Sequence, residues 1–360
     1  MPQLILHARH EQKGAQYALY GGWTLPEHYG DPLSEYRAVR ERVGLADISY
    51  QGMFLITGRD RLPFLQNLVS NDLKLLTVGK GVYATLLTHK GRVLSDIYLY
   101  PLPDALFMEV EGTIAENTRQ HLMRFKLASQ VKIERPPWGA FLLSGPHARA
   151  LLEKATGGPL PPLEEKALFQ KELEGIPATF IKRSITGEED FRLYFPEEGL
   201  EKLWERLLSA GSEYGISPVG QAALETLRIE AGRPRYGTDI DEHIIPIEAG
   251  LEAEAISYTK GCYPGQEVIA RIQTYGHVNK HLSGLIIEGK TLPQKGDKVF
   301  QEEKELGWIT SATLSPFVGK VIAMGYLRPQ ISAPGTAVEV EIDQTRVPAQ
   351  VVERPFYRRK

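Results

Sequence analysis

The chain has 360 residues, more than one ordinary hydrophobic core accommodates, so two or three domains are expected. Hydrophobic residues make up 42% and charged residues 24% of the sequence, and the formal net charge is −3. This nearly neutral charge gives no electrostatic basis for bulk binding of nucleic acid or of a membrane surface. No segment approaches the roughly 20 apolar residues of a membrane span. A single cysteine excludes an intramolecular disulfide, which is typical of the reducing cytoplasm.

The first 135 residues alternate between helical and strand patterns. Apolar residues at helical spacing predict a helix over 33–43, and Gly44 suits its end. A strand is expected at 52–57, followed by a helix that Asp60 can cap. Further strands are expected at 80–88, 92–100 and 105–110, with a helix at 114–125. This order of elements predicts a compact α+β subdomain over about 52–135.

The second half of the chain ends in a pattern of short strands. Strands at 180–183 and 191–195 flank a polar turn, and an amphipathic helix is expected at 201–210. After residue 271, short strands between Gly and Pro turns predict a small β-barrel. Those strands are expected at 281–287, 298–300, 305–310, 322–327 and 338–342. The predicted domains are therefore 1–278 and 279–360.

Several motifs of enzyme chemistry are absent from the sequence. It contains no Gly-rich phosphate loop, no HExxH, no GxSxG and no CxxC. The nine histidines are scattered without the spacing of metal ligands, so no metal site is predicted.

The sole cysteine, Cys262, lies in the segment Lys-Gly-Cys-Tyr-Pro-Gly-Gln-Glu at residues 260–267. Glycine neighbours allow close approach of the backbone to a ligand, and the cations Lys260 and Arg271 favour a thiolate. A buried, inert cysteine is the alternative, although such residues normally lie within apolar runs. Composition favours neither interpretation.

Asp96 lies in a strand of otherwise apolar and aromatic residues. Alternation places Leu94, Asp96, Tyr98 and Tyr100 on one face of that strand. A carboxylate beside two tyrosines suits a planar, polar heterocycle, because the carboxylate accepts from ring N–H groups while the tyrosines pack against the ring. A solvated sheet face is the alternative, and the residues alone favour it slightly.

Three further groups of charged residues are candidates of lower specificity. Glu188 lies in a Thr-Gly-Glu turn, where carboxylates are usually solvated. Arg228 lies beside an apolar helical stripe, where an arginine generally pairs with a carboxylate of the protein or of a ligand. The acidic residues after it most often form a solvated loop; they are Asp239, Asp241, Glu242 and Glu248.

Motifs along nearly the whole chain resemble the glycine-cleavage T-protein (aminomethyltransferase) superfamily. They are residues 21–26, 44–49, 71–72, 91–100, 186–188, 227–232, 237–250 and 325–326. Within the superfamily, residues 260–267 resemble the signature of the YgfZ/IBA57 branch, through Lys260, Gly261, Cys262, Tyr263, Gly265, Gln266 and Glu267. Members of that branch are folate-binding proteins implicated in making or maintaining iron–sulfur clusters.

The resemblance implies a ring of three subdomains around a tetrahydrofolate pocket. These would be a folate-binding α+β domain, a ferredoxin-like subdomain and a C-terminal β-barrel. By motif, Asp96 matches the carboxylate facing the reacting side of folate, and Tyr83 and Tyr100 match pocket tyrosines. Glu188 matches the pterin-binding glutamate, and Arg228 the arginine near the glutamyl tail. Each role suits its side chain, because carboxylates accept from the aminopterin N–H edge and arginine binds carboxylates.

The chain also departs from the T-protein pattern at three places. T-proteins usually carry a histidine and a methionine where this chain has Tyr50-Gln51, and paired aspartates where it has Ser95-Asp96. They also carry an asparagine-rich segment where this chain has residues 110–113. These departures weaken the argument for aminomethyl transfer from a lipoyl carrier.

The leading hypothesis is therefore a folate-binding protein of the YgfZ type that supports iron–sulfur proteins, with Cys262 as a redox or transfer thiol. Its partners would be iron–sulfur client or assembly proteins, and a folate-dependent role in tRNA modification is compatible with it. The alternative is a tetrahydrofolate-dependent aminomethyltransferase that acts with a lipoyl carrier protein, with Asp96 orienting the amine. Folate-dependent oxidative demethylation ranks last, because the flavin domain common in such enzymes is missing.

Overall fold

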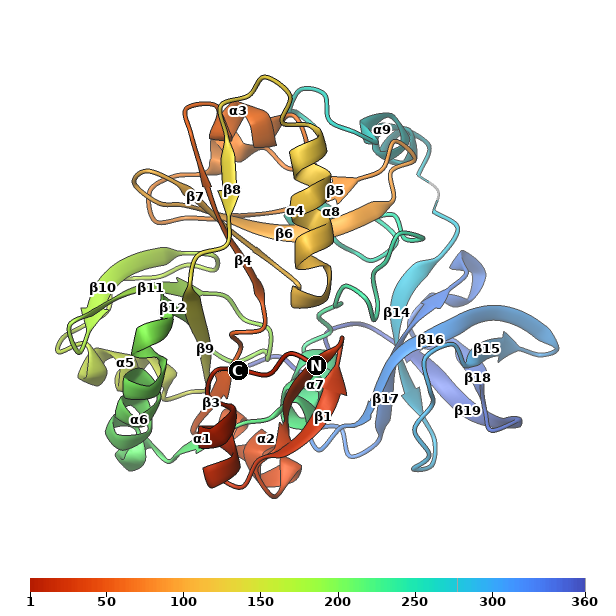
Figure 1. Ribbon diagram of the computed structural model, residues 1–360. Helices are drawn as coiled ribbons and strands as arrows, with labels where there is room; N and C mark the ends of the chain where they lie inside the picture. The colour runs from red at the N-terminus through yellow and green to blue at the C-terminus, as the bar shows by residue number, and fades with distance from the viewer. Residues whose placement is uncertain (277, 360) are drawn as a thin grey trace. The chain divides into compact units, whose positions relative to one another are not determined.

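The computed structural model describes residues 1–276 and 278–359. The chain forms two compact units, each built from three segments. The first unit comprises Met1–Leu62, Lys74–Val82 and Tyr98–Leu227, and the second comprises Pro63–Leu73, Tyr83–Ile97 and Arg228–Lys360. Figure 1 traces the chain by colour. Within the described residues, no helix combines the length and the apolar character that crossing a membrane requires.

A six-stranded sheet forms the centre of the first unit, in the order β10-β11-β12-β9-β3-β13. All neighbouring strands are antiparallel except β13 and β3, which are parallel. The strands are β3 (Val43–Asp47), β9 (Trp138–Ser144), β10 (Leu168–Leu173), β11 (Ile176–Lys182), β12 (Asp190–Pro196) and β13 (Ile216–Pro218). Strands β11 and β12 were predicted, whereas β10, which pairs with β11, was not.

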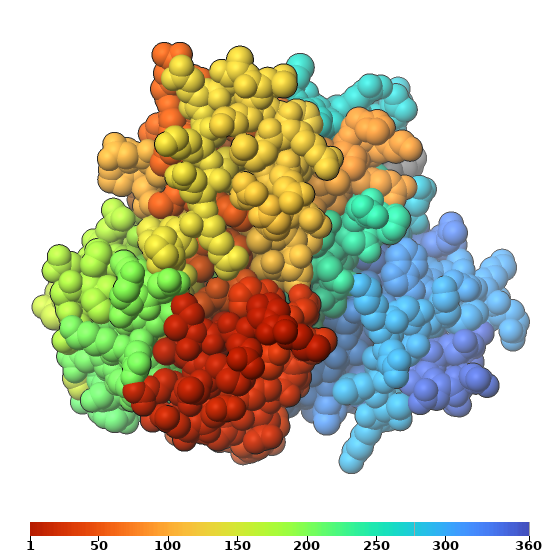
Figure 2. Space-filling view, viewed as in Figure 1, coloured from red at the N-terminus to blue at the C-terminus, as the bar shows by residue number. Residues whose placement is uncertain are grey.

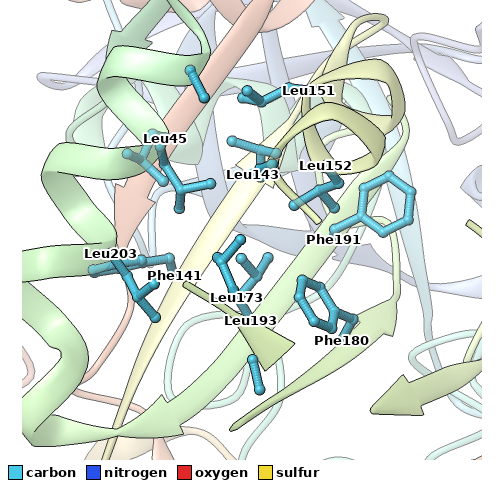
Figure 3. Close-up of a cluster of buried hydrophobic side chains, with 14 of the residues drawn as sticks. Leu45, Phe141, Leu143, Leu151, Leu152, Leu173, Phe180, Phe191, Leu193 and Leu203 are labelled. Atoms are coloured by element: carbon cyan, nitrogen blue, oxygen red, sulfur yellow. The ribbon is translucent and has the colours of Figure 1, made fainter. Parts of the chain in front are cut away.

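Two helices, α5 (Ala148–Ala155) and α6 (Leu200–Ala210), pack against this sheet through a buried apolar cluster. Strand residues such as Phe141, Leu143 and Phe180 gather with Leu152 and Leu203 from the helices (Figure 3). Apolar residues alternate along β12 and recur at helical spacing along α6, so each element presents one face to the same core. The amphipathic helix predicted at 201–210 is confirmed.

Helix α2 (Pro32–Glu41) ends earlier than predicted, and Gly44 lies in strand β3 instead of ending the helix. Asp31 caps the helix by accepting hydrogen bonds from the amides of Leu33 and Ser34, both at 3.1 Å. Gly44 is required for packing: an added Cβ would lie 2.5 Å from Val39 Cγ2 and 2.7 Å from Val219 Cγ2. The glycine therefore allows close approach and does not end a helix.

The subdomain predicted over 52–135 forms a five-stranded sheet in the order β5-β6-β7-β4-β8. Its strands are β4 (Gly52–Thr57), β5 (Val82–Leu87), β6 (Val93–Pro101), β7 (Leu106–Val110) and β8 (Lys132–Glu134). Helix α3 (Arg61–Gln66) follows β4, and α4 (Ala115–Arg124) follows β7. The predicted order strand–helix–strand–strand–strand–helix is present, and the structure adds strand β8, which was not predicted. Buried and half-buried positions alternate from Val93 to Leu99, as the sequence predicted for β6.

Further short elements precede and follow these sheets. The N-terminal ones are α1 (His7–Gln12), β1 (Gln16–Tyr20) and β2 (Trp23–His28), and α7 (Gln221–Glu230), α8 (Glu252–Ala255) and α9 (Gln266–Tyr275) come later. The 3₁₀ helices are η1 (Leu73–Leu75), η2 (Gly112–Ile114), η3 (Glu197–Gly199), η4 (Ser212–Tyr214) and η5 (Pro329–Ile331). Helix α9 was not predicted, although it begins inside the 260–267 segment.

The C-terminal strands close into a six-stranded barrel in the order β14-β17-β16-β15-β18-β19, which confirms the predicted barrel. The strands are β14 (His281–Ile287), β15 (Lys298–Gln301), β16 (Lys304–Leu314), β17 (Val321–Leu327), β18 (Ala337–Ile342) and β19 (Thr345–Val352). The unpredicted last strand, β19, pairs with both β14 and β18 and thereby closes the sheet. The blue C-terminal residues form a continuous body in Figure 2.

Replacing Gly44 should destabilise the first unit. Gly44→Ala adds a Cβ where Val39 and Val219 leave no room, so we expect a loss of about 1–3 kcal/mol in the free energy of unfolding. Chemical denaturation followed by circular dichroism measures it. Gly158→Ala is the control, because the nearest atom to its added Cβ is Lys171 Nζ at 3.9 Å. Equal stability of the two variants would contradict the packing role.

Candidate functional site

Asp96 and Tyr83 form a hydrogen-bonded pair on the hairpin of β5 and β6. The Tyr83 hydroxyl donates to Asp96 Oδ2 at 2.9 Å. Tyr83 is buried and Asp96 is half-buried, which rules out the solvated sheet face that the residues alone slightly favoured. A tyrosine hydroxyl that donates to a carboxylate fixes the orientation of the carboxylate, and carboxylate oxygens accept hydrogen bonds from cationic or N–H groups.

Tyr236 is a third residue of this site that the sequence did not single out. Its hydroxyl lies 3.5 Å from the carbonyl oxygen of Val93, on the strand that carries Asp96. Burial and then the negative charge of Asp96 raise the pKa of Tyr236 to about 12. The hydroxyl therefore stays protonated at neutral pH and can donate. Only its position immediately before the 237–250 motif region, next to Gly237, could have indicated it.

The residues of the 260–267 segment differ in how deeply they are buried. The Lys260 ammonium is buried, and it donates to the carbonyl oxygens of Gln66, Val69 and Asn71 at 2.5, 2.6 and 3.1 Å. Burial, partly offset by Asp72, lowers the pKa of Lys260 to about 8, so the amine is protonated at pH 7.

The remaining members of the segment lead into helix α9. Tyr263 is buried, and Gly265 precedes the helix with a left-handed φ of 83°. Gln266 is the first residue of α9, and its side-chain amide lies 3.4 Å from the carbonyl oxygen of Lys260. Glu267 is exposed and pairs with Arg271 at 3.0 Å within the same helix.

Cys262 and Gly261 are exposed. The buried, inert interpretation of this thiol is therefore wrong. The argument for a thiolate is also weakened, because Lys260 binds three carbonyl oxygens and Arg271 pairs with Glu267. Exposure leaves Cys262 accessible to reagents but assigns no chemistry to it.

In the first unit, Glu188 is buried and not solvated as its turn position suggested. Its carboxylate accepts from Arg40 Nη1 at 3.0 Å. The turn is held by Asp190, which accepts from the amides of Ile185 and Thr186 at 2.7 and 3.0 Å. A fully buried aspartate at the start of β12 therefore sets the position of Glu188, and the sequence signal for it was the second acidic residue after the Thr-Gly-Glu turn.

Tyr100 is fully buried beside a network of charges that the sequence analysis missed. Arg183 and Arg192 donate to Glu109 Oε1 at 2.5 and 2.6 Å, and the Tyr194 hydroxyl donates to Glu109 Oε2. The Tyr100 hydroxyl lies 3.4 Å from Arg183 Nη1.

Arg183 also stacks on Tyr98, with its guanidinium carbon 3.7 Å from the ring centroid. Burial alone would raise the pKa of Glu109, but the two arginines outweigh it and the pKa is lowered. Glu109 was detectable as a lone charge in the apolar strand β7.

Arg228 is buried in the second unit, where it pairs with a carboxylate of the protein itself. Its Nη1 donates to Asp239 Oδ2 at 2.6 Å and to the carbonyl oxygen of Arg233 at 2.8 Å, and its Nη2 donates to Ser311 at 2.9 Å. Asp239 also accepts from Thr310 at 2.6 Å.

The acidic residues after Arg228 do not form one solvated loop. Asp239 is buried, and so is Glu248, which accepts from the amide of Ile245 at 3.0 Å and pairs with Lys280 at 3.3 Å. Asp241 and Glu242 are more exposed. Across residues 1–276 and 278–359, no group of three His, Cys, Asp or Glu side chains is placed to hold a metal ion.

Two family models match this chain in order. The GCVT N-terminal domain matches residues 6–260, and the glycine cleavage T-protein C-terminal barrel domain matches residues 280–358. The chain belongs to the glycine-cleavage T-protein family. An aminomethyltransferase of Symbiobacterium thermophilum is 36% identical, over 98% of this chain and 96% of that protein. One of Geobacillus sp. is 33% identical over 98% of both chains.

A solved structure leads to the same family. The crystal structure of glycine cleavage system aminomethyltransferase T from Bartonella henselae matches with a TM-score of 0.92 and 26% identity. The match covers 99% of this chain and 98% of that one. The α+β T-protein fold with its C-terminal barrel is thereby confirmed, and aminomethyltransferases of this family use tetrahydrofolate, the cofactor that the sequence predicted.

These matches overturn the leading sequence-based hypothesis of function. Relatives that are 30–36% identical over nearly the full chain are named aminomethyltransferases. The assignment to iron–sulfur cluster assembly or repair is therefore wrong, and the YgfZ/IBA57 branch, its iron–sulfur partners and tRNA modification are not shown. That assignment relied on the eight residues 260–267, whereas the family similarity extends over both domains.

The ion pair of Arg228 and Asp239 should make stability depend on pH. Burial raises the pKa of Asp239, but Arg228 and the hydrogen bonds from Ser311 and Thr310 lower it further than burial raises it. Because the folded-state pKa is depressed, the pair's contribution is complete above the unfolded pKa near 4 and is lost as pH falls through the folded value. Asp239→Asn should cost about 3–5 kcal/mol at pH 7 by leaving a buried guanidinium without its carboxylate.

Urea denaturation at pH 7 and at pH 3 measures this effect. We expect the stability difference between wild type and Asp239→Asn to shrink at the lower pH. Asp343→Asn, at an exposed turn of the barrel, is the control and should match wild type at both values. If the difference in unfolding free energy between wild type and Asp239→Asn were the same at both pH values, the predicted pH dependence would be contradicted.

Proposed function

We propose that this chain is an aminomethyltransferase that transfers the one-carbon group of an aminomethylated lipoyl carrier protein to tetrahydrofolate and releases ammonia. The observation that carries the proposal is the Tyr83–Asp96 pair at 2.9 Å, in a chain that matches aminomethyltransferases from end to end. The lipoyl carrier takes the place of the iron–sulfur partners among the expected partners.

The side chains at the predicted positions suit a reduced folate. Glu188 is a buried carboxylate fixed by Arg40, and such a group accepts from the amino and ring N–H donors of a pterin. By motif, Tyr100 corresponds to a pocket tyrosine and Arg228 to the arginine near the glutamyl tail, but Tyr100 is fully buried and Arg228 is paired with Asp239. When bound, tetrahydrofolate supplies the nitrogen atoms that accept the one-carbon group.

Asp96 is proposed as the catalytic carboxylate. Its charge stabilises the positive charge that develops on the substrate amine as the carbon–sulfur bond to the lipoyl group weakens. The hydrogen bond from Tyr83 holds the carboxylate in one orientation, so little reorganisation is needed during the reaction. Tyr236, which stays protonated, adds a hydrogen-bond donor near the same strand.

Other parts of the sequence-based account stay predictions. They are the role of Cys262 as a redox or transfer thiol, the division into domains 1–278 and 279–360, and the cytoplasmic location. The exposed Cys262 lies outside the Tyr83–Asp96 hairpin, and the reaction proposed above requires no thiol of the protein.

Asp96→Asn should abolish most of the transfer activity. The amide keeps the size of the side chain but removes its charge, so kcat should fall by about 100- to 1,000-fold. The assay combines purified protein, tetrahydrofolate and aminomethylated lipoyl carrier, and it measures methylene-tetrahydrofolate and ammonia. Asp104→Asn, at an exposed position on the loop after β6, is the control. Absence of product from wild-type protein would contradict the proposed function.

Glu188→Gln should weaken tetrahydrofolate binding. The change replaces a charge-assisted acceptor by a neutral one, so Kd should rise by about 10-fold. Calorimetric titration measures this without any turnover. Glu198→Gln, an exposed residue of the same unit, is the control. Equal affinities of Glu188→Gln and wild type would remove Glu188 from the ligand site.

A further inference from the structure

The segment 260–267 has no role in the proposed reaction, yet its first residue is buried and fully engaged. Lysine has three N–H donors, and Lys260 directs them to three backbone carbonyl oxygens between residues 66 and 71. Because each acceptor belongs to the backbone, the ammonium holds the path of that short stretch irrespective of its side chains.

The stretch held by Lys260 is bonded in turn to strand β5. The carbonyl oxygen of Asn71 accepts from Lys260, and its side-chain amide donates to the carbonyl oxygen of Tyr83 at 2.9 Å. Ser70 exchanges hydrogen bonds with Thr85 through both its amide and its hydroxyl. Two residues on the same strand are thus tied to the stretch, and one of them, Tyr83, orients Asp96.

The other end of the segment packs on the tip of the same hairpin. A Cβ at Gly265 would lie 2.5 Å from the carbonyl oxygen of Thr88 and 2.9 Å from the Cα of Gly91. A Cβ at Gly91 would in turn lie 3.0 Å from Val268 Cβ. At Gly265 the backbone packs against the backbone of the hairpin tip, and at Gly91 it packs against the Val268 side chain, so both positions leave no room for a Cβ.

We propose that residues 260–267 form a clamp that fixes the β5–β6 hairpin at both ends, with Lys260 as a positioning residue for the Tyr83–Asp96 pair. The inference rests on the proposed function for its catalytic consequence. It assigns to the segment a structural role toward Asp96 that needs no chemistry of Cys262. A misplacement of about 1 Å at a catalytic group can cost 100-fold in rate, so a loose hairpin would slow the reaction without contacting the substrate.

Lys260→Met tests the clamp, because methionine keeps the unbranched side chain but removes all three donors. We expect kcat for aminomethyl transfer to fall by about 10- to 100-fold while KM for tetrahydrofolate changes less than about 2-fold. Gly265→Ala disturbs the other end of the clamp and should give the same split. Lys320→Met, which removes an exposed ion pair with Glu288 on the barrel, is the control and should match wild type.

Hydrogen–deuterium exchange gives a second readout that does not depend on turnover. In Lys260→Met and Gly265→Ala, amides of residues 83–97 should exchange faster than in wild type, while those of barrel strands β17 and β18 should not. If Lys260→Met fails to fold, Gly265→Ala carries both measurements. Unchanged exchange over 83–97 overturns the clamp, and so does unchanged kcat in a variant with faster exchange. Inactive wild-type protein would refute the proposed function, and exchange alone would then decide the clamp.

Discussion

Buried carboxylates paired with arginine are the constraint on which both units depend. Glu109 in the first unit and Asp239 in the second are buried, and each accepts from arginine and from hydroxyl groups. Taking a charge out of water costs several kcal/mol unless partners replace the lost hydration. The loops and strands that supply those partners are therefore fixed in place, because moving one of them would leave a charge unsatisfied.

The candidate catalytic carboxylate differs from these structural ones in a way that suits its role. Asp96 is only half-buried, and the partner that orients it is a neutral tyrosine. Asp239 is fully buried with Arg228, whereas Asp96 lies at a half-buried position. A half-buried carboxylate can be reached by a substrate, whereas a fully buried and paired one stabilises the fold.

Sequence reasoning succeeded where the signal was local and periodic. Alternation along β6 placed Asp96 on one face with Leu94 and Tyr98, which are half-buried like it, and Gly/Pro-punctuated strands predicted the barrel. It failed where the environment of a residue is set by contacts with residues that are distant in the sequence. Glu188 is buried and pairs with Arg40, which is far away in the sequence, and Gly44 is required by Val39 and Val219. No local pattern records such contacts, and pattern alone did not indicate the closing strand β19.

The error about function has a physical explanation in the 260–267 segment. Its most constrained contacts are those of Lys260 with three carbonyl oxygens and of Gly265 with the backbone of a hairpin. Because these contacts are made to backbone atoms, they fix the geometry of the hairpin whatever side chains it carries. They therefore contain no information about the substrate. A short motif of this kind can accompany any reaction that needs the hairpin held still. Function has to be inferred instead from the groups that hairpin presents, and here those are Tyr83 and Asp96.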